Sequence, residues 1–137
     1  MKAYLLDTNI VSFALRDRPP SVLAALRRLR PDQTGISAVT LAELRFGAAR
    51  SASRLRYDGL ITTFVSRVRV FPFDDAAAEA YGGVRAALES SGQRIGDLDM
   101  LIAGHALALG RVLVTNNRRE FDRVVGLEVE DWSQGNP

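Results

Sequence analysis

Three acidic side chains lie where a parallel α/β sheet would present them to a ligand. Asp7 ends the short apolar run at residues 3–6, which is typical of a strand covered on both faces. Glu43 lies on the helix that follows the next predicted strand, and Asp99 stands at the start of a later helix. Because ligands of open α/β sheets bind outside the carboxyl ends of the strands, these carboxylates are candidate site residues. Carboxylates gathered without basic partners repel one another, and a hard divalent cation is the usual compensation.

Other polar residues are expected at the same edge of the sheet, namely Asn9, Ser37, Asp97, Thr115, Asn116 and Asn117. Oxygen ligands in a chain with no cysteine and one histidine indicate Mg²⁺ or Mn²⁺ rather than Zn²⁺. Such an ion can lower the pKa of a water and stabilise charge on a phosphodiester during an in-line displacement. These residue types therefore favour metal-assisted hydrolysis of a phosphodiester.

Several of these residues also have a purely structural interpretation. Asp7 can be only a helix N-cap or a turn residue. The spacing Thr40-x-x-Glu43 matches a capping box, in which Glu43 reaches back to an N-terminal amide. The same helix can equally start at Ser37 and leave Glu43 free. His105 lies on an apolar, alanine-rich helix and is interpreted as a packed structural histidine rather than a ligand.

The elements that must position these residues alternate between strand and helix. Short apolar runs predict strands at residues 3–6 and 111–115, and an alternation of basic and apolar residues predicts one at 68–73. Two further short strands are predicted at residues 34–37 and 127–130. Amphipathic stretches predict helices at residues 10–15, 21–29, from 37 or 40 to 49, 52–68, 75–90 and 100–109. Thr8 or Asn9 is expected to cap the first helix. This alternation predicts an α/β fold in which helices cover both faces of a parallel sheet.

Length and composition fit one globular domain. The chain has 137 residues, of which 47% are hydrophobic and 25% charged. No apolar run approaches the ~20 residues that a membrane-spanning helix needs, so no membrane association is expected. Asp7 interrupts the first apolar stretch too early for a signal peptide, and the lack of cysteine fits a reducing cytoplasm.

The basic residues are 17 arginines and a single lysine, Lys2. A P-loop needs a Gly-Lys-Ser/Thr sequence, which is absent. A phosphohydrolase or receiver-like domain would need a lysine late in the chain, so these alternatives are disfavoured. The arginines recur in clusters. These clusters either lie on solvated helix faces or bind phosphate groups through their guanidinium side chains.

Four short motifs resemble those of a known family. Asp7-Thr8-Asn9, Ala42-Glu43-Leu44, Asp99-x-x-Ile102-Ala103 and Val114-Thr115-Asn116-Asn117-x-x-x-Phe121 are similar, in order and spacing, to PIN-domain ribonucleases. The resemblance extends over essentially the whole chain and is greatest to the VapC toxins of prokaryotic toxin–antitoxin pairs. It implies a three-layer α/β/α PIN-like fold with a central parallel sheet of four to five strands. Residues 1–132 would form the PIN domain, and residues 133–137 a loose C-terminal tail.

The resemblance also implies roles for individual residues. Asp7, Glu43 and Asp99 match the three acidic residues of the family, as catalytic residues and as ligands of Mg²⁺ or Mn²⁺. Asn117 is assigned to catalysis, whereas Asn9, Thr115 and Asn116 are assigned to substrate binding. Many relatives have a fourth aspartate where this chain has Asn116-Asn117, which leaves open whether one or two metals bind. Asp97 could supply the missing charge.

The resemblance further implies a Mg²⁺-dependent endoribonuclease, the toxin of a type II toxin–antitoxin system in the cytoplasm. The alternative is a non-catalytic PIN-like module that binds RNA or protein. Expected partners are a small VapB-like antitoxin, an RNA such as tRNA, and a second copy of the chain in a homodimer. Helices between residues 40 and 68 are predicted to bind an antitoxin helix through apolar residues, namely Leu44, Phe46, Leu55, Leu60 and Phe64.

Overall fold

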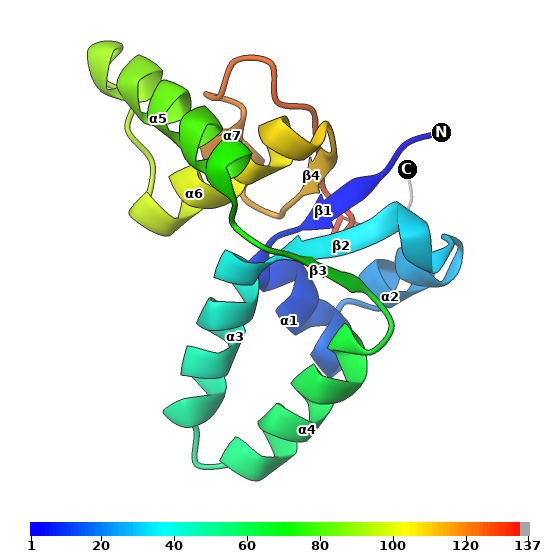
Figure 1. Cartoon of the computed structure of the whole chain (residues 1–137). Helices are drawn as coiled ribbons and strands as arrows, with labels where there is room; N and C mark the ends of the chain where they lie inside the picture. The colour runs from blue at the N-terminus through cyan, green and yellow to red at the C-terminus, as the bar shows by residue number, and fades with distance from the viewer. Residues whose placement is uncertain (135–137) are drawn as a thin grey trace.

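The strand that begins the chain lies at the centre of a five-stranded sheet (Figure 1). The computed structural model describes residues 1–134. The strands are β1 (Tyr4–Leu6), β2 (Thr34–Ser37), β3 (Arg69–Phe71), β4 (Val112–Val114) and β5 (Val129–Glu130). They lie in the order β3-β2-β1-β4-β5, and every neighbouring pair is parallel. The predicted parallel sheet is therefore confirmed.

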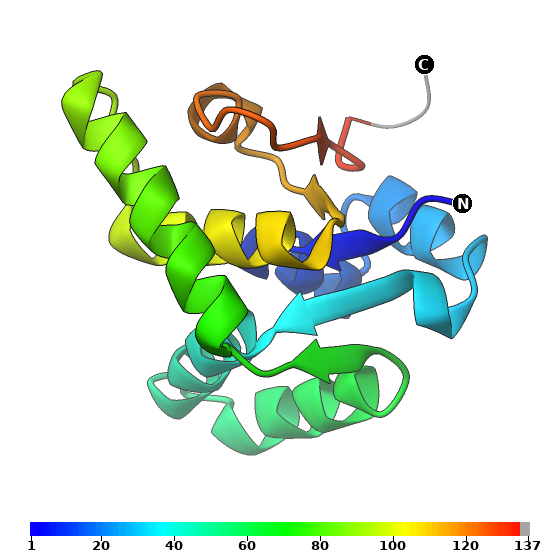
Figure 2. The same ribbon diagram turned by 45° about the horizontal axis from the view of Figure 1, so that its top comes forward.

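Helices cover both faces of this sheet, so the fold has three layers (Figures 1 and 2). One face carries α1 (Thr8–Arg16), α2 (Pro20–Arg27), α3 (Ala38–Ala49) and α4 (Arg54–Val65), and the other carries α5 (Asp75–Ser90), α6 (Asp97–Leu109) and α7 (Arg118–Phe121). Successive strand residues point to opposite faces, because Leu5 packs in the core under α5 and α6 whereas Leu6 packs under α1 and α3. This three-layer α/β/α arrangement is the predicted one.

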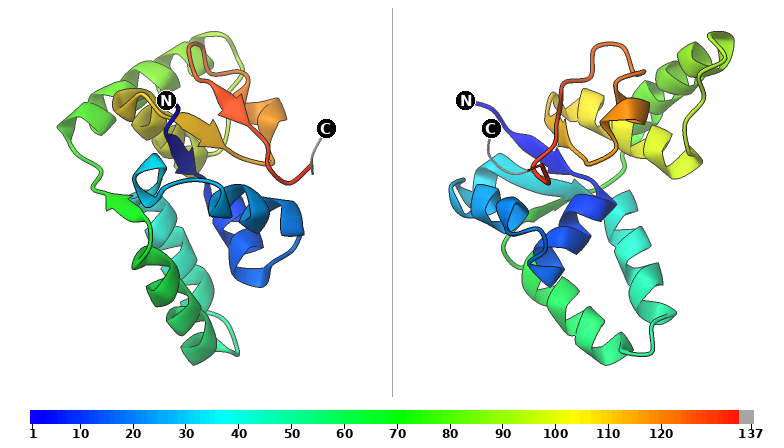
Figure 3. Two further views of the ribbon diagram at one scale, coloured as in Figure 1. Left: turned by 90° about the vertical axis from the view of Figure 1, so that its right-hand side faces the viewer. Right: turned by 180° about the vertical axis from the view of Figure 1, so that it is seen from behind.

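Two helix pairs extend from the sheet in different directions. The α3–α4 pair forms an antiparallel hairpin on one side, and α5 packs across α6 on the other (Figure 3). The starts of α1, α3 and α6 come together between them, near the carboxyl ends of the strands (Figure 1). Asp7 and Asp99 lie at the starts of α1 and α6, and Glu43 lies in the second turn of α3.

The ends of several elements differ from the predictions by a few residues. The helix predicted over residues 52–68 is shorter (Arg54–Val65), and the one predicted from residue 100 begins earlier, at Asp97. Two short elements were not predicted, the 3₁₀ turn η1 (Pro31–Gln33) and α7. A single turn contains too few residues for a periodic pattern to reveal it.

The C-terminal end is tied to the N-terminal half. The Trp132 ring lies edge-on to Tyr4 with centroids 5.2 Å apart, and the Ser21 hydroxyl donates to the Trp132 carbonyl at 2.7 Å. In the predicted tail, the Ser133 hydroxyl donates to Asp131 at 2.6 Å, while residues 135–137 lie outside the described residues. Within residues 1–134, no helix combines the length and apolarity needed to span a bilayer.

Candidate active site

The carboxyl ends of β1 and β4 mark the point where the strand order reverses. The chain continues from β1 to β2 and β3 on one side, whereas β4 and β5 lie on the other. Helices leaving two such strands diverge and leave a crevice, where ligands of open α/β sheets bind. Asp7 follows β1, Thr115 follows β4, and the Asp7 amide donates to the Val114 carbonyl at 3.0 Å. The predicted residues from these two strands are therefore neighbours.

Asp7 is the N-cap of α1 as well as a residue of the crevice. Its Oδ1 accepts a hydrogen bond from the Ile10 amide at 2.9 Å, and only 5% of the residue is exposed. The prediction that Thr8 or Asn9 caps this helix is wrong, because Thr8 is already the first helical residue. The cap uses Oδ1, and the Asp7 carboxylate also interacts with the side chain of Thr115.

The pKa of Asp7 is raised from 3.8 to about 6. Burial is the largest cause, and the negative charges of Asp99 and Glu43 add to it. Hydrogen bonds from Thr115 and from the Ile10 amide act in the opposite direction, because they stabilise the charged form. Because burial and nearby negative charge disfavour the bare carboxylate, binding of either a proton or a cation would stabilise Asp7.

Glu43 faces the crevice from the second turn of α3. Ser37 caps this helix, with its Oγ accepting from the Val39 amide at 3.0 Å. The capping box between Thr40 and Glu43 is therefore wrong; Thr40 is inside the helix and buried, and within residues 1–134 its hydroxyl has no hydrogen-bond partner. Glu43 instead accepts a hydrogen bond from the Thr8 hydroxyl at 2.5 Å, which links α3 to the start of α1.

Asp99 lies in the first turn of α6, whose N-cap is Gly96. A β-carbon at Gly96 would come within 3.1 Å of Asp99 Oδ2, so the glycine leaves room for this carboxylate. The pKa of Asp99 is raised to about 6, chiefly by burial and then by the charges of Glu120 and Glu43. Asp99 is therefore electrostatically coupled to the acidic residues of the other two elements.

Glu120 is the site residue that the sequence analysis missed. It lies half-buried in α7, and its charge is the second cause of the raised pKa of Asp99. The available signal was its position, because it is the first carboxylate after the strand that ends in Val114. The Glu120 carboxylate thus lies on the segment after β4, where we expected only the side-chain amides of Asn116 and Asn117.

The predicted amide residues form a second, uncharged part of the crevice. Asn9 Nδ2 donates to Asn116 Oδ1 at 3.3 Å, which joins the first turn of α1 to the loop that follows β4. Thr115 is fully buried, and its hydroxyl oxygen accepts a hydrogen bond from the backbone N–H of Asn117 at 2.9 Å. The structure thus places all four residues around the ends of β1 and β4.

Asp97 and His105 lie outside this acidic group. The Asp97 carboxylate is paired with Arg94, and its side chain is 72% exposed. The pairing lowers the pKa of Asp97, opposite to the shift at Asp99, so Asp97 does not supply the extra charge of the site. His105 is buried, with Nδ1 2.8 Å from Ser37 Oγ and its ring edge-on to Phe73, which confirms the structural interpretation.

The acidic side chains do not converge on a single point. Among residues 1–134, no three His, Cys, Asp or Glu side chains are close enough to hold one ion together. They are nevertheless close enough to raise the pKa of Asp7 and Asp99, and no basic side chain is among the groups that shift these two. Mg²⁺ commonly keeps several waters and takes only one or two carboxylates directly. The donor set therefore fits a hydrated, hard cation.

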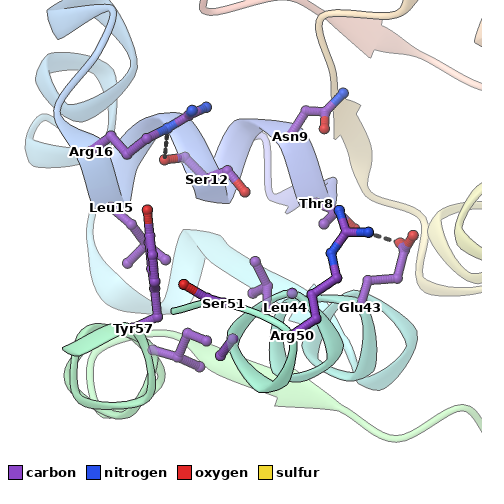
Figure 4. A pocket seen from close by; sticks show the side chains of 13 residues that line it. Thr8, Asn9, Ser12, Leu15, Arg16, Glu43, Leu44, Arg50, Ser51 and Tyr57 are labelled. Atoms are coloured by element: carbon purple, nitrogen blue, oxygen red, sulfur yellow. Dashed lines mark hydrogen bonds between the residues drawn. The ribbon is translucent and has the colours of Figure 1, made fainter. Parts of the chain in front are cut away.

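A groove of about 680 Å³ opens from the acidic residues between α1 and the α3–α4 pair (Figure 4). Thr8, Asn9 and Glu43 lie at one end, and Arg16 and Tyr57 at the other. The crevice therefore continues into this groove, which Glu43 lines together with residues of α1 and α4.

Known proteins share this architecture and sequence. The PIN domain family matches residues 4–127. The tRNA(fMet)-specific endonuclease VapC of Shigella flexneri is 45% identical over 97% of this chain and 100% of its own length. Ribonuclease VapC2 of Haemophilus influenzae is 37% identical over 96% of this chain and 99% of its own.

Solved structures agree with these relatives. A chain of the DNA-bound VapBC complex from Salmonella typhimurium superposes with a TM-score of 0.90 at 39% identity, covering 96% of this chain and 99% of that chain. VapBC2 from Rickettsia felis, bound to a promoter DNA fragment, gives 0.89 at 37% identity, with 95% and 98% covered. The family match and these identities extend over nearly the whole chain. This chain therefore belongs to the PIN domain family and, within it, to the VapC ribonucleases, the toxins of VapBC toxin–antitoxin systems.

Proposed function

We propose that this chain is a Mg²⁺-dependent endoribonuclease that hydrolyses a phosphodiester bond of tRNA(fMet). The observation that carries the proposal is the coupling of Asp7 and Asp99, whose pKa values are both raised to about 6 at the switch point of the sheet. Titratable groups perturbed by burial and by one another in a crevice are typical of functional sites. Structural ion pairs do not explain these shifts, because no basic partner is involved.

Each side chain then has a definite task. Asp7 and Asp99 would hold Mg²⁺, or Mn²⁺ in its place, with Glu43 and Glu120 adding negative charge around it. A bound ion would supply a water nucleophile at neutral pH and offset charge on the phosphate. Thr8 orients Glu43 through their 2.5 Å hydrogen bond. Thr115 positions Asn117 next to the site, and the Asn9–Asn116 pair offers amides to the RNA backbone.

The substrate follows from the relatives and from the arginines. The Shigella flexneri and Salmonella typhimurium relatives, 45% and 39% identical, are named as tRNA(fMet)-specific. In this chain 17 of the 18 basic residues are arginines, whose planar forks suit phosphate. Recognition of a folded RNA by shape and exposed loop bases fits such a surface better than indiscriminate cutting. The cytoplasm is the expected compartment.

Cleavage of a tRNA(fMet) transcript by purified protein tests the proposal. Wild-type protein with Mg²⁺ should cut the transcript, and EDTA should abolish cutting. Asp99→Asn should remove activity, whereas Asp97→Asn should retain it, because both residues lie in the first turn of α6 but only Asp99 belongs to the acidic group. A non-catalytic binding module would bind the transcript without cutting it, and equal cutting by the wild type and Asp99→Asn would refute the assigned site.

An antitoxin and a second copy of the chain are the proposed protein partners. An apolar pocket of about 420 Å³ lies between α2 and α4, lined by Leu23, Leu26, Leu60 and Phe64 among others. Of the five residues predicted to bind an antitoxin, Leu60 and Phe64 line this pocket, whereas Leu44 is buried in the core. Phe46 and Leu55 are exposed, at 64% and 88%. An amphipathic antitoxin helix would bury these apolar surfaces.

A further inference from the structure

The helix that carries Asp99 is held against the sheet almost entirely by apolar contacts. Among the buried residues of α6, only His105 has a polar side chain, and the others include the small residues Ala103, Gly104 and Ala106. Apolar packing is non-directional, so it holds a helix on a sheet more firmly than it fixes the position of that helix along its own axis. His105 is therefore the residue of α6 that can fix this position through a directional bond.

The His105 ring reaches from α6 to the residue that caps α3. Its Nδ1 lies 2.8 Å from Ser37 Oγ. The Val39 N–H donates to the same Oγ at 3.0 Å, which leaves the Ser37 hydroxyl free to donate its own hydrogen to Nδ1. Burial lowers the pKa of His105, which keeps the ring neutral and Nδ1 able to accept. Within residues 1–134, no other side-chain hydrogen bond joins α6 to β2 or α3.

The surroundings of this bond hold it in one geometry. The rings of Phe73 and Phe71 lie edge-on to the His105 ring, with centroids 5.3 and 6.5 Å away. His105 is 1% exposed and Ser37 is fully buried, so bulk water does not compete for the bond. Breaking it would leave a buried polar atom without its partner, which is costly.

The bond lies at equal separations in the sequence from two carboxylates of the acidic site. Asp99 precedes His105 by six residues in α6, and Glu43 follows Ser37 by six residues in α3. Six helical residues rise about 9 Å, so each carboxylate lies within two turns of the bond. The charge of Glu43 contributes to the raised pKa of Asp99, so the two groups act on each other. A shift of α6 against α3 would therefore move one acidic group relative to the other.

We propose, on the basis of the proposed ribonuclease function, that His105 is a positioning residue that acts through Ser37 and sets the position of Asp99 relative to Glu43. His105 is not a ligand of the metal and does not bind the RNA. A histidine that only fills the core could be replaced by an apolar side chain of similar size without loss of activity. A positioning histidine, in contrast, requires the hydrogen bond to the cap of α3.

Two substitutions of His105 separate these roles in steady-state cleavage of the tRNA(fMet) transcript. His105→Leu fills a similar volume without a polar atom, whereas the side-chain amide in His105→Asn can bond to Ser37 in place of Nδ1. His105→Leu should lower kcat by about tenfold with KM nearly unchanged, because a displaced acidic group weakens the transition state more than RNA binding. His105→Asn should recover most of this loss, although it fills the core less well.

Three further variants are the controls. Val84→Ala loosens the core under α5 and α6 on another helix, so it should lower the melting temperature and leave kcat unchanged. Thr40→Val removes a buried hydroxyl of α3 that has no hydrogen-bond partner within residues 1–134, so it should leave kcat unchanged. Ser37→Gly keeps a tolerated cap but removes the hydroxyl, so its loss of kcat should match that of His105→Leu, and the double variant should lose no more.

Binding of Mn²⁺, measured by electron paramagnetic resonance, is the readout that does not require cleavage. His105→Leu should raise the Kd for Mn²⁺ several-fold, and His105→Asn and Val84→Ala should not. Equal kcat and Kd for the wild type and His105→Leu would overturn the proposal, and so would a His105→Asn protein as impaired as His105→Leu. If His105→Leu does not fold, Ser37→Gly decides in its place. A wild type that binds Mn²⁺ without cutting RNA would refute the ribonuclease proposal, and the Kd values would still decide the role of His105.

Discussion

At the scale of single residues, the acidic site is a balance between burial and charge. Burial, together with the charges of neighbouring carboxylates, raises the pKa of both Asp7 and Asp99 to about 6. A proton and a cation therefore compete for each carboxyl group near neutral pH. Because a divalent ion would satisfy several of these charges together, the site is arranged to lose protons when metal binds.

The stability of the metal-free protein should consequently fall as pH rises from about 4 to about 6. In this range Asp7 and Asp99 keep their protons in the folded state but lose them in the unfolded chain, so folding is favoured at the acid end. The contribution is lost as pH rises through about 6, and for Asp7 it is about 2–3 kcal/mol.

Urea unfolding in EDTA at a series of pH values would measure this contribution as a difference from the double variant Asp7→Asn, Asp99→Asn. Subtracting the double variant removes the effect of every other titrating group. A difference that stays constant, or that grows with pH, would contradict the raised pKa values.

The sequence predicted the acidic residues that follow regular elements, but not their partners. Asp7 and Glu43 could be found because an apolar strand and a helix locate them. Glu120 could not, because α7 is a single turn whose position depends on how the chain leaves β4. The pairing of Asp97 with Arg94 depends on the conformation of the segment before α6, which has no periodic signal.

At the scale of elements, close packing of α5 on α6 fixes the helix that carries Asp99. A β-carbon at Gly104 of α6 would meet the Cα and N atoms of Tyr81 in α5 at 2.7 Å. The backbones therefore approach as closely as glycine allows at this crossing. His105, the next residue of α6, bonds to Ser37, the cap of α3. The position of α6 is thus coupled to the helix that carries Glu43.

Gly104→Ala should destabilise the protein by about 1–3 kcal/mol, because α5 and α6 must separate to admit the methyl group. Gly82→Ala, in the open face of α5, is the matched control, and it should stabilise the protein slightly. Chemical denaturation of both variants would measure the difference. A Gly104→Ala protein as stable as the wild type would show that the two helices are not rigidly packed.

The sequence indicated the strands and long helices, but not their neighbours in space. All five strands were located, the central β1 and β4 by apolar runs typical of buried parallel strands and the edge strand β3 by alternation of basic and apolar residues. Their order across the sheet, which places β4 beside β1, depends on crossovers that leave no local pattern. The closeness of the Asp7 and Thr115 segments was therefore an inference from the fold class, whereas the structure gives it directly.

At the scale of the whole molecule, the groove beside the acidic residues and an apolar pocket adjoin α4 on different sides. Ile61 and Tyr57 contribute to the groove, whereas Leu60 and Phe64 contribute to the apolar pocket between α2 and α4. The two surfaces are therefore separate, and each is lined by a different set of α4 side chains.

Thr63→Glu should weaken the complex with the proposed small VapB-like antitoxin, because it places a charge in the apolar pocket. Thr62→Glu is the matched control, since Thr62 is equally exposed but lies outside that pocket. Co-expression followed by size-exclusion chromatography would compare the two variants. If wild-type protein and antitoxin eluted as separate peaks, the partner assignment would fail; if Thr63→Glu bound as tightly as the wild type, the pocket assignment would fail.

Metal binding measured by calorimetry and thermal melts, for the wild type, Asp99→Asn and Asp97→Asn, tests the acidic site most directly. In EDTA, Asp99→Asn should melt above the wild type, because one uncompensated buried charge is gone. Excess Mg²⁺ should raise the melting temperature of the wild type and Asp97→Asn by similar amounts, and that of Asp99→Asn by less. An Asp99→Asn protein that binds Mg²⁺ as tightly as the wild type, with the same thermal shift, would contradict a metal site built on Asp7 and Asp99.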